Sequence, residues 1–473
     1  MGSLSDDRVD LGLAEATRAI REGALGAASY CAALEARADE ASGLNIFISR
    51  NPRLAEQAAE VDARRARGEA LGPLAGAPLL VKDNIDTAGL PTSAGTPALK
   101  AWRPRADAPV LRRLLDAGAL VMGKANLQEL ALGITSNNRA FGPVRNPYDP
   151  ALIAGGSSGG TAAGIAARVS PAGLGSDTAG SIRIPAALCG VTGLRPTLGR
   201  WSQAGIVPLS ASRDTAGPMA RSVADLALLD AIVTGESGSV DAGEIRLGLP
   251  QGGFWDDLDP AVARLCRDAV DLLKDQGIEF ISVDVAAIVE TAERIGRALT
   301  LYECIPDLRR YLQAGGCEVT AEAVIAGIAS PDVAYGYALA ASGEVGAETY
   351  RLARETLQPR LRGLYAELFA SHGLDALIFP ATPLPARPVG QDGTVELNGR
   401  QVDTRATYLR NTEQGALAGL PGLALPAGLT EAGLPVGLEL DGPAGSDRRL
   451  LAIGEALEAA LGRLPPPPRS AGP

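Results

Sequence analysis

The sequence predicts an α/β protein in which helices pack against a mainly parallel or mixed central sheet. Apolar runs of strand length alternate with stretches of helical periodicity, which is typical of layered α/β folds. Of the 473 residues, 46% are hydrophobic and 21% are charged, so the chain can bury a large core. We find no internal repeat and no linker long enough to separate domains. We therefore expect one large domain.

The first 70 residues predict a helical segment. Apolar residues recur with a period near 3.6 over residues 10–42, apart from an interruption at Gly23–Gly26, so two amphipathic helices fit. Pro52–Arg67 predicts a third helix, whose basic last turn suits a helix C-terminus.

Strands and helices alternate after this segment. Leu79–Lys82 and Leu120–Gly123 are apolar and predict buried strands, with a helix at Ala108–Ala117 between them. Asn126–Leu132 predicts a short helix. The polar loop Gly133–Asn138 then leads into a stretch rich in glycine and serine.

The second half of the chain continues this pattern. Asp259 and Pro260 form an N-cap and a first-turn proline, which open a helix that runs to about Gln276. Residues 286–372 are mostly helical, and an Asn-Gly turn predicts a hairpin over 395–402. The other predicted elements are helices at Ser222–Thr234 and Asp447–Leu461 and strands at Ile245–Leu249, Phe280–Val285, Leu374–Phe379, Leu423–Pro426 and Val436–Leu440.

Charge and composition exclude several classes of partner. The net charge of −11 and the lack of a basic run argue against nucleic acid and anionic membranes. There is no run of 18 apolar residues and no apolar core of a signal peptide, so we expect no membrane association. The five cysteines are far apart and include no C-x-x-C pair, as in reduced thiols of a cytoplasmic protein.

The chain is organised around the residues 155–185, where two glycine-rich loops flank a helix of small residues. The first loop, Gly155–Gly160, carries Ser157, and the second, Gly173–Gly180, is followed by Ser181. Glycine lets the backbone approach a ligand closely, and successive N–H groups can converge on one oxygen. The stretch predicts either a phosphate cradle or an oxyanion site beside a nucleophile.

Known motifs favour serine chemistry over phosphate binding. No lysine lies between Lys124 and Lys274, which excludes a P-loop, and Thr178 stands where a dinucleotide fingerprint needs its third glycine. Gly156–Gly160 satisfies the nucleophile pattern G-x-S-x-G but lacks the preceding strand. The one histidine, His372, lies where a predicted helix ends, so a histidine-based triad finds little support.

Lys82 is the candidate base for a serine, because it ends an apolar run that predicts a buried strand. Burial disfavours the ammonium, and a fall of about three pKa units, at a cost of about 4 kcal/mol, would bring it towards neutrality. A neutral lysine can activate a serine. Alternatively, Lys82 extends its charge from a strand end and pairs with Asp83 or Asp86, and the strand alone favours this alternative.

Lys82, the sequence GGSSGG at 155–160 and the sequence GLGSDTAGSIRIPAALCG at 173–190 together resemble the amidase signature family. Their order, and the 24-residue interval between the first loop serine and the last, are those of the family. The resemblance implies cleavage or transfer of amide bonds by a Ser–cisSer–Lys triad. Ser181 would be the nucleophile, Ser157 the bridging serine in cis configuration and Lys82 the base.

The resemblance also implies a fold and a division of the chain. It implies a single amidase-signature domain, 1–473, with a central twisted mixed β-sheet flanked by α-helices on both sides. Residues 1–70 would be the N-terminal helical segment, 75–220 the signature catalytic core and 286–372 a variable helical region that shapes the substrate pocket. Residues 465–473 would be a disordered proline-rich tail.

Backbone N–H groups near the nucleophile would form the oxyanion hole. The resemblance implies Thr178, Ala179 and Gly180 as its residues, together with the amide of Ser181. Aligned donors of this kind are typically worth several kcal/mol of barrier. Ala179 stands where the family often has glycine, and an ordinary negative φ would fit it.

Three further residues would support the site. Asp177 and Arg183 flank the nucleophile and resemble a charge pair that braces the loop. Ser158 either hydrogen-bonds within the site or bonds to the backbone as any loop serine does. Cys189 is most simply a packed core thiol.

Shorter matches resemble the indoleacetamide and mandelamide hydrolase branch of the family. They lie at residues 133–138, 143–147, 199–208, 408–412 and 433–442. An aryl substrate needs apolar walls, for which Ile134, Thr135, Ile206 and Tyr302 are candidates. The chain has only 18 aromatic residues, so these walls would be mostly aliphatic. We expect a small-molecule substrate, a primary arylacetamide-type amide that is cleaved to an acid and ammonia.

Three alternatives stay open. The chain could be the amidase subunit of a glutamine-dependent tRNA amidotransferase, or an aryl-acylamidase that acts on anilides. It could also be a catalytically silent binding or scaffold protein, although the complete set of Lys82, Ser157 and Ser181 argues against this.

No metal and no cofactor are expected. The sequence has no Cys/His cluster, no H-E-x-x-H and no EF-hand loop. The oligomeric state is left open, a homodimer included.

Overall fold

The computed structural model describes residues 7–238 and 240–468, and an 11-stranded mixed sheet runs through them. The strands are β1 (Phe47–Arg50), β2 (Pro78–Lys82), β3 (Leu120–Ala125), β4 (Asn137–Asn138), β5 (Gly142–Pro143), β6 (Ala172–Asp177), β7 (Thr192–Arg195), β8 (Thr215–Ala220), β9 (Arg246–Gln251), β10 (Glu279–Asp284), β11 (Ala376–Pro380), β12 (Thr394–Leu397), β13 (Arg400–Asp403), β14 (Gly422–Leu429) and β15 (Pro435–Asp441). The large sheet has the order β1-β3-β2-β6-β8-β7-β14-β15-β11-β9-β10. β4 pairs with β5, and β12 with β13, in two small separate ladders.

Parallel pairing occurs in two parts of the large sheet. β2 runs parallel to both β3 and β6, and β9 runs parallel to both β10 and β11. The strands between them, including the β14–β15 pair, are antiparallel to their neighbours. The mixed sheet confirms the predicted fold class.

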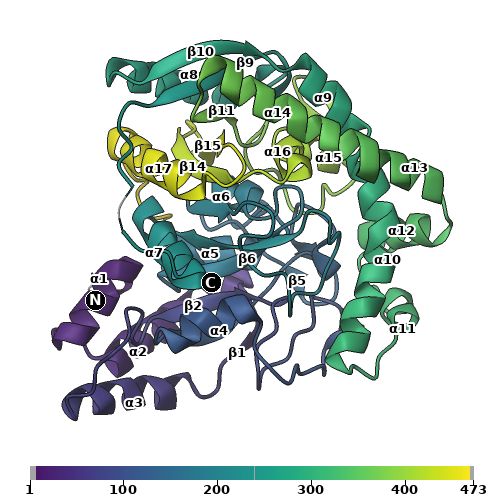
Figure 1. Ribbon diagram of the computed structural model, residues 1–473. Helices are drawn as coiled ribbons and strands as arrows, with labels where there is room; N and C mark the ends of the chain where they lie inside the picture. Colours follow the sequence, from purple (N-terminus) through teal and green to yellow (C-terminus); the bar gives the residue numbers. More distant parts are fainter. Residues whose placement is uncertain (1–6, 239, 469–473) are drawn as a thin grey trace.

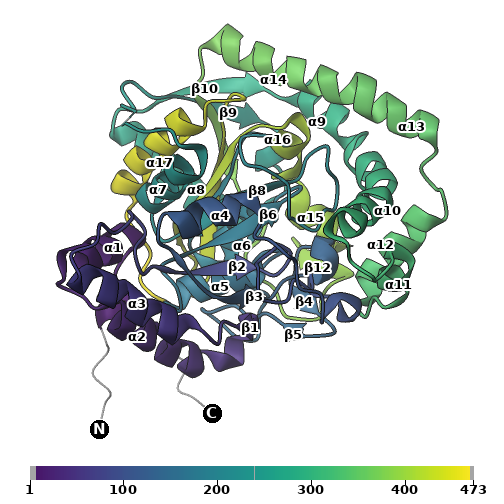
Figure 2. The same cartoon turned by 60° about the horizontal axis from the view of Figure 1, so that its bottom comes forward.

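Helices cover both faces of the sheet (Figure 1, Figure 2). They are α1 (Leu13–Glu22), α2 (Ala27–Glu40), α3 (Leu54–Ala66), α4 (Pro109–Asp116), α5 (Gly159–Ala166), α6 (Arg183–Cys189), α7 (Val223–Thr234), α8 (Pro260–Asp275), α9 (Ala286–Glu293), α10 (Gly296–Gly315), α11 (Ala321–Ala326), α12 (Pro331–Ala341), α13 (Ala347–Arg351), α14 (Gln358–His372), α15 (Thr404–Leu409), α16 (Glu413–Ala418) and α17 (Asp447–Leu461). Both views show α10 to α14 along one side of the molecule.

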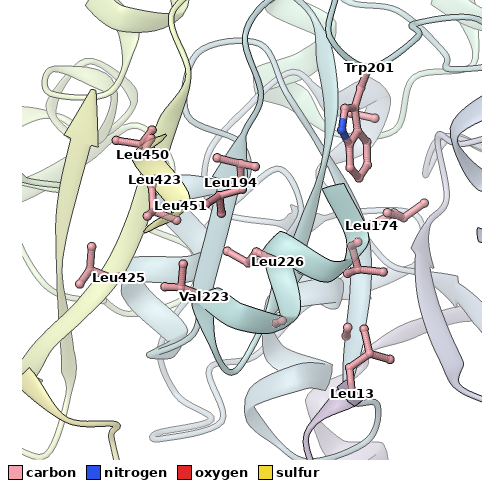
Figure 3. Packing of buried hydrophobic residues seen from close by; sticks show 14 of the residues in the cluster. Leu13, Leu174, Leu194, Trp201, Val223, Leu226, Leu423, Leu425, Leu450 and Leu451 are labelled. Atoms are coloured by element: carbon pink, nitrogen blue, oxygen red, sulfur yellow. The ribbon is translucent and has the colours of Figure 1, made fainter. Parts of the chain in front are cut away.

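One apolar core lies between the sheet and α4, α7, α8 and α17 (Figure 3). Leu174, Leu194 and Leu423 of the sheet belong to it, as do Leu226 of α7 and Leu450 of α17, and all five are fully buried. Full burial of such a side chain contributes about 1.5–3 kcal/mol. This core fixes the middle of the sheet, including β6, from one side.

The opposite face of the sheet is covered closely by α5 and α6. A Cβ atom added at Gly160 would lie 2.4 Å from the Asn126 carbonyl oxygen, and one added at Gly164 would lie 2.3 Å from Leu80 Cδ1. Such distances leave no room for a side chain. The small residues of α5 therefore let this helix lie directly on β2.

Most predicted elements are present. The three N-terminal helices form, Asp259 caps α8 by accepting a hydrogen bond from the Ala261 amide, and α17 has the predicted bounds. The hairpin at 395–402 forms from β12 and β13. The region 286–372 is helical, with a π-helical turn at Leu352–Leu357. The predicted tail, 465–473, lies partly outside the described residues.

Two predicted elements differ from the structure. Asn126–Leu132 contains only a 3-10 turn, Glu129–Ala131, because Leu130 and Ala131 have φ values of 51° and 56°, which no α-helix accepts. The first part of the predicted loop Gly173–Gly180 is strand β6. Its glycines serve close strand packing, since a Cβ at Gly173 would lie 2.6 Å from the Leu80 carbonyl oxygen.

Three further strands of the large sheet have no counterpart among the predicted elements, and neither do the short strands β4 and β5. β1 lies within the segment predicted to be helical, and β7 and β8 lie between Ser181 and α7. The sequences of β7 and β8, TGLR and TAGPMA, lack the β-branched and aromatic runs that identify strands. In the described part of the chain, no helix is both long and apolar enough to cross a membrane.

Candidate active site

The carboxyl ends of β2 and β6 form the base of the candidate site. These strands are parallel neighbours, paired through Leu80 with Gly173 and Val81 with Leu174, so both end at the same edge of the sheet. Carboxyl ends of parallel strands commonly carry the functional groups of α/β proteins. Here they bring Lys82, the last residue of β2, beside the end of β6.

Lys82 is fully buried and contacts two serines. Its Nζ lies 2.7 Å from Ser157 Oγ, 2.9 Å from Ser176 Oγ and 3.2 Å from the Ser176 carbonyl oxygen. Asp83, considered as an ionic partner, instead lies 3.5 Å from the buried Nζ of Lys124, and Asp86 accepts a hydrogen bond from Tyr311. The predicted contact between Lys82 and Ser157 is therefore present, and the alternative, an ion pair of Lys82 with Asp83 or Asp86, is not formed.

Burial sets the protonation of Lys82. Desolvation lowers the pKa of this ammonium to about 7, against the opposing charges of Asp177 and Asp214. Near neutral pH a large fraction of Lys82 is therefore uncharged and can accept a proton.

The loop between β5 and α5 places both of its serines against β6. The Gly156–Ser157 peptide bond is cis, as the resemblance implies, and the Ser157 carbonyl oxygen accepts a hydrogen bond from the Gln128 amide at 3.2 Å. Ser158 donates its hydroxyl to the Ser176 carbonyl oxygen at 3.2 Å and its amide to the Ser181 carbonyl oxygen at 3.1 Å. Ser158 thus joins the two glycine-rich segments.

Ser181 lies in the turn between β6 and α6 and is 6% exposed. Among the described residues, its hydroxyl has no hydrogen-bond partner, so the predicted contact between Ser157 and Ser181 is not closed in this conformation. The two serines nevertheless belong to segments that are joined directly by the Ser158 amide.

The amides of the turn differ from the predicted oxyanion hole at one residue. The Gly180 amide donates to Asp177 Oδ1 at 2.8 Å and is therefore engaged. The amides of Thr178, Ala179 and Ser181 have no acceptor within the part of the chain that is described. The available donors are those at 178, 179 and 181, because Asp177 occupies the one at 180.

Comparison with known proteins agrees with this geometry. The family model described as Amidase matches residues 29–451. The chain is 43% identical to an indoleacetamide hydrolase of Agrobacterium vitis, over 90% of this chain and 92% of that protein. It is 40% identical to a mandelamide hydrolase of Pseudomonas putida, over 98% and 93% of the two chains. A crystal structure of an amidase superposes with a TM-score of 0.86 at 35% identity, over 96% of this chain and all of that one.

The chain belongs to the amidase family. Within this amidase fold, the predicted charge pair of Asp177 and Arg183 lies beside the turn that carries Ser181. Arg183 Nη2 lies 3.1 Å from Asp177 Oδ1, and Arg195 Nη1 lies 3.2 Å from the same oxygen. Burial alone would raise the pKa of Asp177, but the two guanidinium groups lower it far below its usual range. Asp177 is therefore a permanent anion that accepts hydrogen bonds from the Gly180 and Ile182 amides.

From the sequence we did not identify four residues that contact this site, which are Asn84, Ser176, Asp214 and Thr412. Ser176 accepts from Lys82 and from Asn84 Nδ2, the latter at 2.9 Å. Asp214 accepts the Thr178 hydroxyl at 2.6 Å, and Thr412 donates its hydroxyl to the Ala179 carbonyl oxygen at 2.5 Å. Ser176 stands inside the family motif, and Thr412 lies in the branch match at 408–412. Asp214 had no comparable signal.

A cavity of about 40 Å³ lies beside Ser176 and Thr178. Of the four predicted pocket residues, only Ile206 lines it. Ile134 packs in an apolar cluster with Ala179, and the Thr135 hydroxyl is bound to Gln128 and Asp392. Tyr302 stacks on Tyr350, with ring centroids 4.0 Å apart, on the helical side of the molecule. The cavity walls are Asn84, Ala131, Ser176, Thr178, Gln203, Ile206, Val207, Pro208, Leu209, Asp214 and Thr215.

Two other residues behave as the sequence indicates. Cys189 is fully buried, its Sγ lies 3.2 Å from the Ala154 carbonyl oxygen, and burial raises the pKa of this thiol. His372 is the last residue of α14, and its Nδ1 contacts Leu368 and Ser371. Within residues 7–238 and 240–468, no cluster of three or more His, Cys, Asp or Glu side chains could hold a metal ion.

Proposed function

We propose that this chain hydrolyses a primary arylacetamide-type amide through a seryl acyl-enzyme, giving a carboxylic acid and ammonia. The observation that carries the proposal is the 2.7 Å contact between Ser157 Oγ and a buried Lys82 whose pKa burial lowers to about 7. The relatives named indoleacetamide and mandelamide hydrolase support the substrate class.

Acylation uses the three residues in sequence. Neutral Lys82 takes the proton of Ser157, and Ser157 takes the proton of Ser181 as Ser181 Oγ attacks the amide carbonyl carbon. This transfer requires the two serine hydroxyls to come within hydrogen-bonding distance. Ser157 then gives a proton to the leaving nitrogen and takes one back from the Lys82 ammonium, the C–N bond breaks, and ammonia leaves the acyl-serine.

Deacylation repeats these steps with water. Water gives a proton to Ser157 as its oxygen attacks the ester carbon, and Ser181 leaves with a proton returned from Ser157. The tetrahedral oxyanion of both steps is stabilised by the amides of Thr178, Ala179 and Ser181, the free donors of the turn. The scheme uses protein side chains, backbone amides, the substrate and water.

The substrate pocket extends from the cavity beside Thr178. Its apolar walls are Ile206, Val207 and Leu209. Such aliphatic walls suit an aryl group in a pocket with few aromatic residues. The helical region 286–372 borders this pocket through α10. Glu303 of α10 accepts hydrogen bonds from the hydroxyls of Ser210 and Ser212, which lie in the loop after Leu209. We also propose a cytoplasmic protein, since all five cysteines are free.

The proposal is tested by a substrate panel and one variant. Indoleacetamide, phenylacetamide, mandelamide, anilides, short aliphatic amides and glutamine are compared by kcat/KM. We expect the arylacetamides to be preferred. A preference for anilides would keep the mechanism and discard the primary-amide substrate, and a preference for glutamine would favour the amidotransferase-subunit alternative.

Ser181→Ala removes the nucleophile. We expect the variant to lose turnover by at least about 1,000-fold, to resist labelling by a serine-reactive fluorophosphonate and to keep its thermal stability. Ser371→Ala, an exposed serine at the end of α14, is the matched control. Turnover close to wild type in Ser181→Ala would contradict the assignment.

A further inference from the structure

Behind the nucleophile turn, five charged side chains are buried together. Asp177 ends β6, Arg183 begins α6, Arg195 ends β7, and Glu439 and Asp441 belong to β15. Arg183 contacts Asp177, Glu439 and, at 3.9 Å, Asp441, and Arg195 contacts Asp177. The exposed fraction of each of these side chains is 1% or less. Water therefore cannot screen the charges of this cluster.

The backbone makes room for the two carboxyl groups of β15. Glu439 and Asp441 are two residues apart on one strand, so both side chains project from the same face of the sheet. A Cβ added at Gly415 would lie 2.1 Å from Asp441 Oδ2, and one added at Gly422 would lie 3.0 Å from both Asp441 Oδ1 and Arg183 Cδ. Glycine at these two positions is what allows the pair to be buried.

The cluster has three carboxyl groups and two guanidinium groups. Asp177 is balanced by both arginines and accepts five hydrogen bonds, two from backbone amides and three from guanidinium nitrogens. Glu439 Oε2 and both carboxyl oxygens of Asp441, in contrast, have no hydrogen-bond donor among the described residues. A buried carboxylate without donors is strongly disfavoured, and one proton on the pair would supply both a donor and charge balance.

The other titratable group that faces the pair is Tyr365 of α14. It is fully buried, and its pKa is raised by burial and by the charges of Asp441 and Glu439. Its hydroxyl is also without a partner in the described structure, so it stays neutral and does not remove the excess negative charge.

We propose that Glu439 and Asp441 share one proton at neutral pH, and that this pair positions Arg183 and, through it, Asp177 and the turn that carries Ser181. Asp177 accepts hydrogen bonds from the amides of Gly180, at 2.8 Å, and Ile182, at 3.0 Å. These two residues lie on either side of Ser181. A second ionised carboxylate beside Arg183 would draw that guanidinium away from Asp177. Glu439 and Asp441 are thus positioning residues.

The electrostatic environment of the pair agrees with a bound proton. Burial raises the pKa of Asp441 to about 6 and raises that of Glu439 well above its usual range, while Arg183 opposes both shifts. Because the two carboxyl groups interact strongly, they titrate as a pair with shared apparent pKa values.

Infrared difference spectroscopy tests the proton directly and needs no substrate. Glu439→Gln keeps the side-chain shape and an oxygen acceptor for Arg183, and its amide group can donate to Asp441. At pH 7 we expect wild type to show the C=O stretching band of a protonated carboxylic acid, and Glu439→Gln to lack it. Glu431→Gln, whose side chain is 89% exposed, should leave the band unchanged. Absence of the band in wild type would overturn the proposal.

The pH dependence of unfolding provides a second test that is independent of activity. The pair keeps its proton when folded, whereas an unfolded glutamate releases it above a pKa of about 4.3. Wild type therefore loses stability as pH rises across this window, and Glu439→Gln does not. The ratio of the unfolding constants, wild type to Glu439→Gln, should rise about tenfold per pH unit between pH 5 and pH 6. A ratio that stays constant would contradict a shared proton.

The positioning role rests on the proposed function and is tested by turnover. Glu439→Leu removes the acceptor of Arg183 and should lower kcat by about 100-fold with little change in KM, since small displacements at a reacting group have effects of this size. Glu439→Gln should restore kcat to near wild type. A folded Glu439→Leu with wild-type kcat would refute positioning. If wild type cleaves no amide, the proposed function fails, and the infrared and unfolding results still decide whether the proton is present.

Discussion

Thr412 donates its hydroxyl to the carbonyl oxygen of Ala179 at 2.5 Å, although 233 residues separate the two in sequence. The same turn is held by Asp214, which accepts the Thr178 hydroxyl, and by Asp177, which accepts the Gly180 amide. Two remote segments and the neighbouring Asp177 therefore fix three successive residues before Ser181. Donors that are fixed in advance stabilise a developing oxyanion better than mobile ones.

Thr412→Val should weaken catalysis without unfolding the protein. Valine keeps the shape of threonine but cannot bond the Ala179 carbonyl, so the peptide that precedes Gly180 loses its orientation. We expect kcat to fall by about 10- to 100-fold, and KM to change little, because the loss acts on the transition state.

The control for Thr412→Val is Thr291→Val. Thr291 is also buried, but its hydroxyl bonds only to Ala287 of its own helix, at 2.7 Å. Equal losses of kcat in both variants would show that the effect is general rather than local to the turn.

The activity should fall on the acid side of neutrality. Lys82 must be uncharged to take a proton, and burial lowers its pKa to about 7. Below that pH the ammonium predominates, so kcat/KM should decrease about tenfold per pH unit, as expected for one essential base in the free enzyme. A profile that is flat from pH 8 to pH 5 would contradict the role of Lys82.

Lys82→Arg should not preserve activity. Arginine carries a charge at every accessible pH and presents no neutral nitrogen to Ser157. We expect losses of at least about 100-fold in kcat for both Lys82→Arg and Lys82→Met. Substantial activity in the arginine variant would mean that positive charge, rather than proton transfer, is what the site requires.

Lys82→Met should also change the dependence of stability on pH. The folded-state pKa of about 7 lies below the usual 10.5, so the folded protein binds fewer protons than the unfolded chain between these values. Wild-type stability should therefore rise relative to Lys82→Met as pH increases from 7 to 10, by about 3–4 kcal/mol. Denaturant unfolding of both proteins at several pH values measures this difference. Parallel curves would show that Lys82 is not desolvated.

The sequence predicts the chemistry of the site better than its walls. Lys82, Ser157 and Ser181 lie in three short segments, and the pairing of β2 with β6 brings Lys82 beside the segment that leads to Ser181. Asp214 and Thr412 act on the turn from remote segments, and only the folded chain shows which turn residues they contact. Sequence patterns carry little information on such long-range pairs.

Pocket residues and glycine-rich strands were predicted least well. The Thr135 hydroxyl hydrogen-bonds to Gln128 and Asp392. The local sequence does not reveal these contacts. β6 has the sequence AGLGSD, whose glycines suggest a loop. They are needed because Leu80 and Ser158 leave no space for a Cβ at Gly173 and Gly175. Glycine here reflects packing density, which only the tertiary structure defines.

The position of β14 and β15 has a consequence for how the protein is made. These strands are synthesised after both β7 and β11, yet they pair with β7 on one side and β11 on the other, in the interior of the sheet. Until they insert, β7 and β11 each expose an unpaired edge, and contacts between such distant segments form slowly. A nascent chain that already contains Ser181 still lacks Thr412 and Glu439. The ribosome must therefore extend the polypeptide through β15 before the amidase site can assemble.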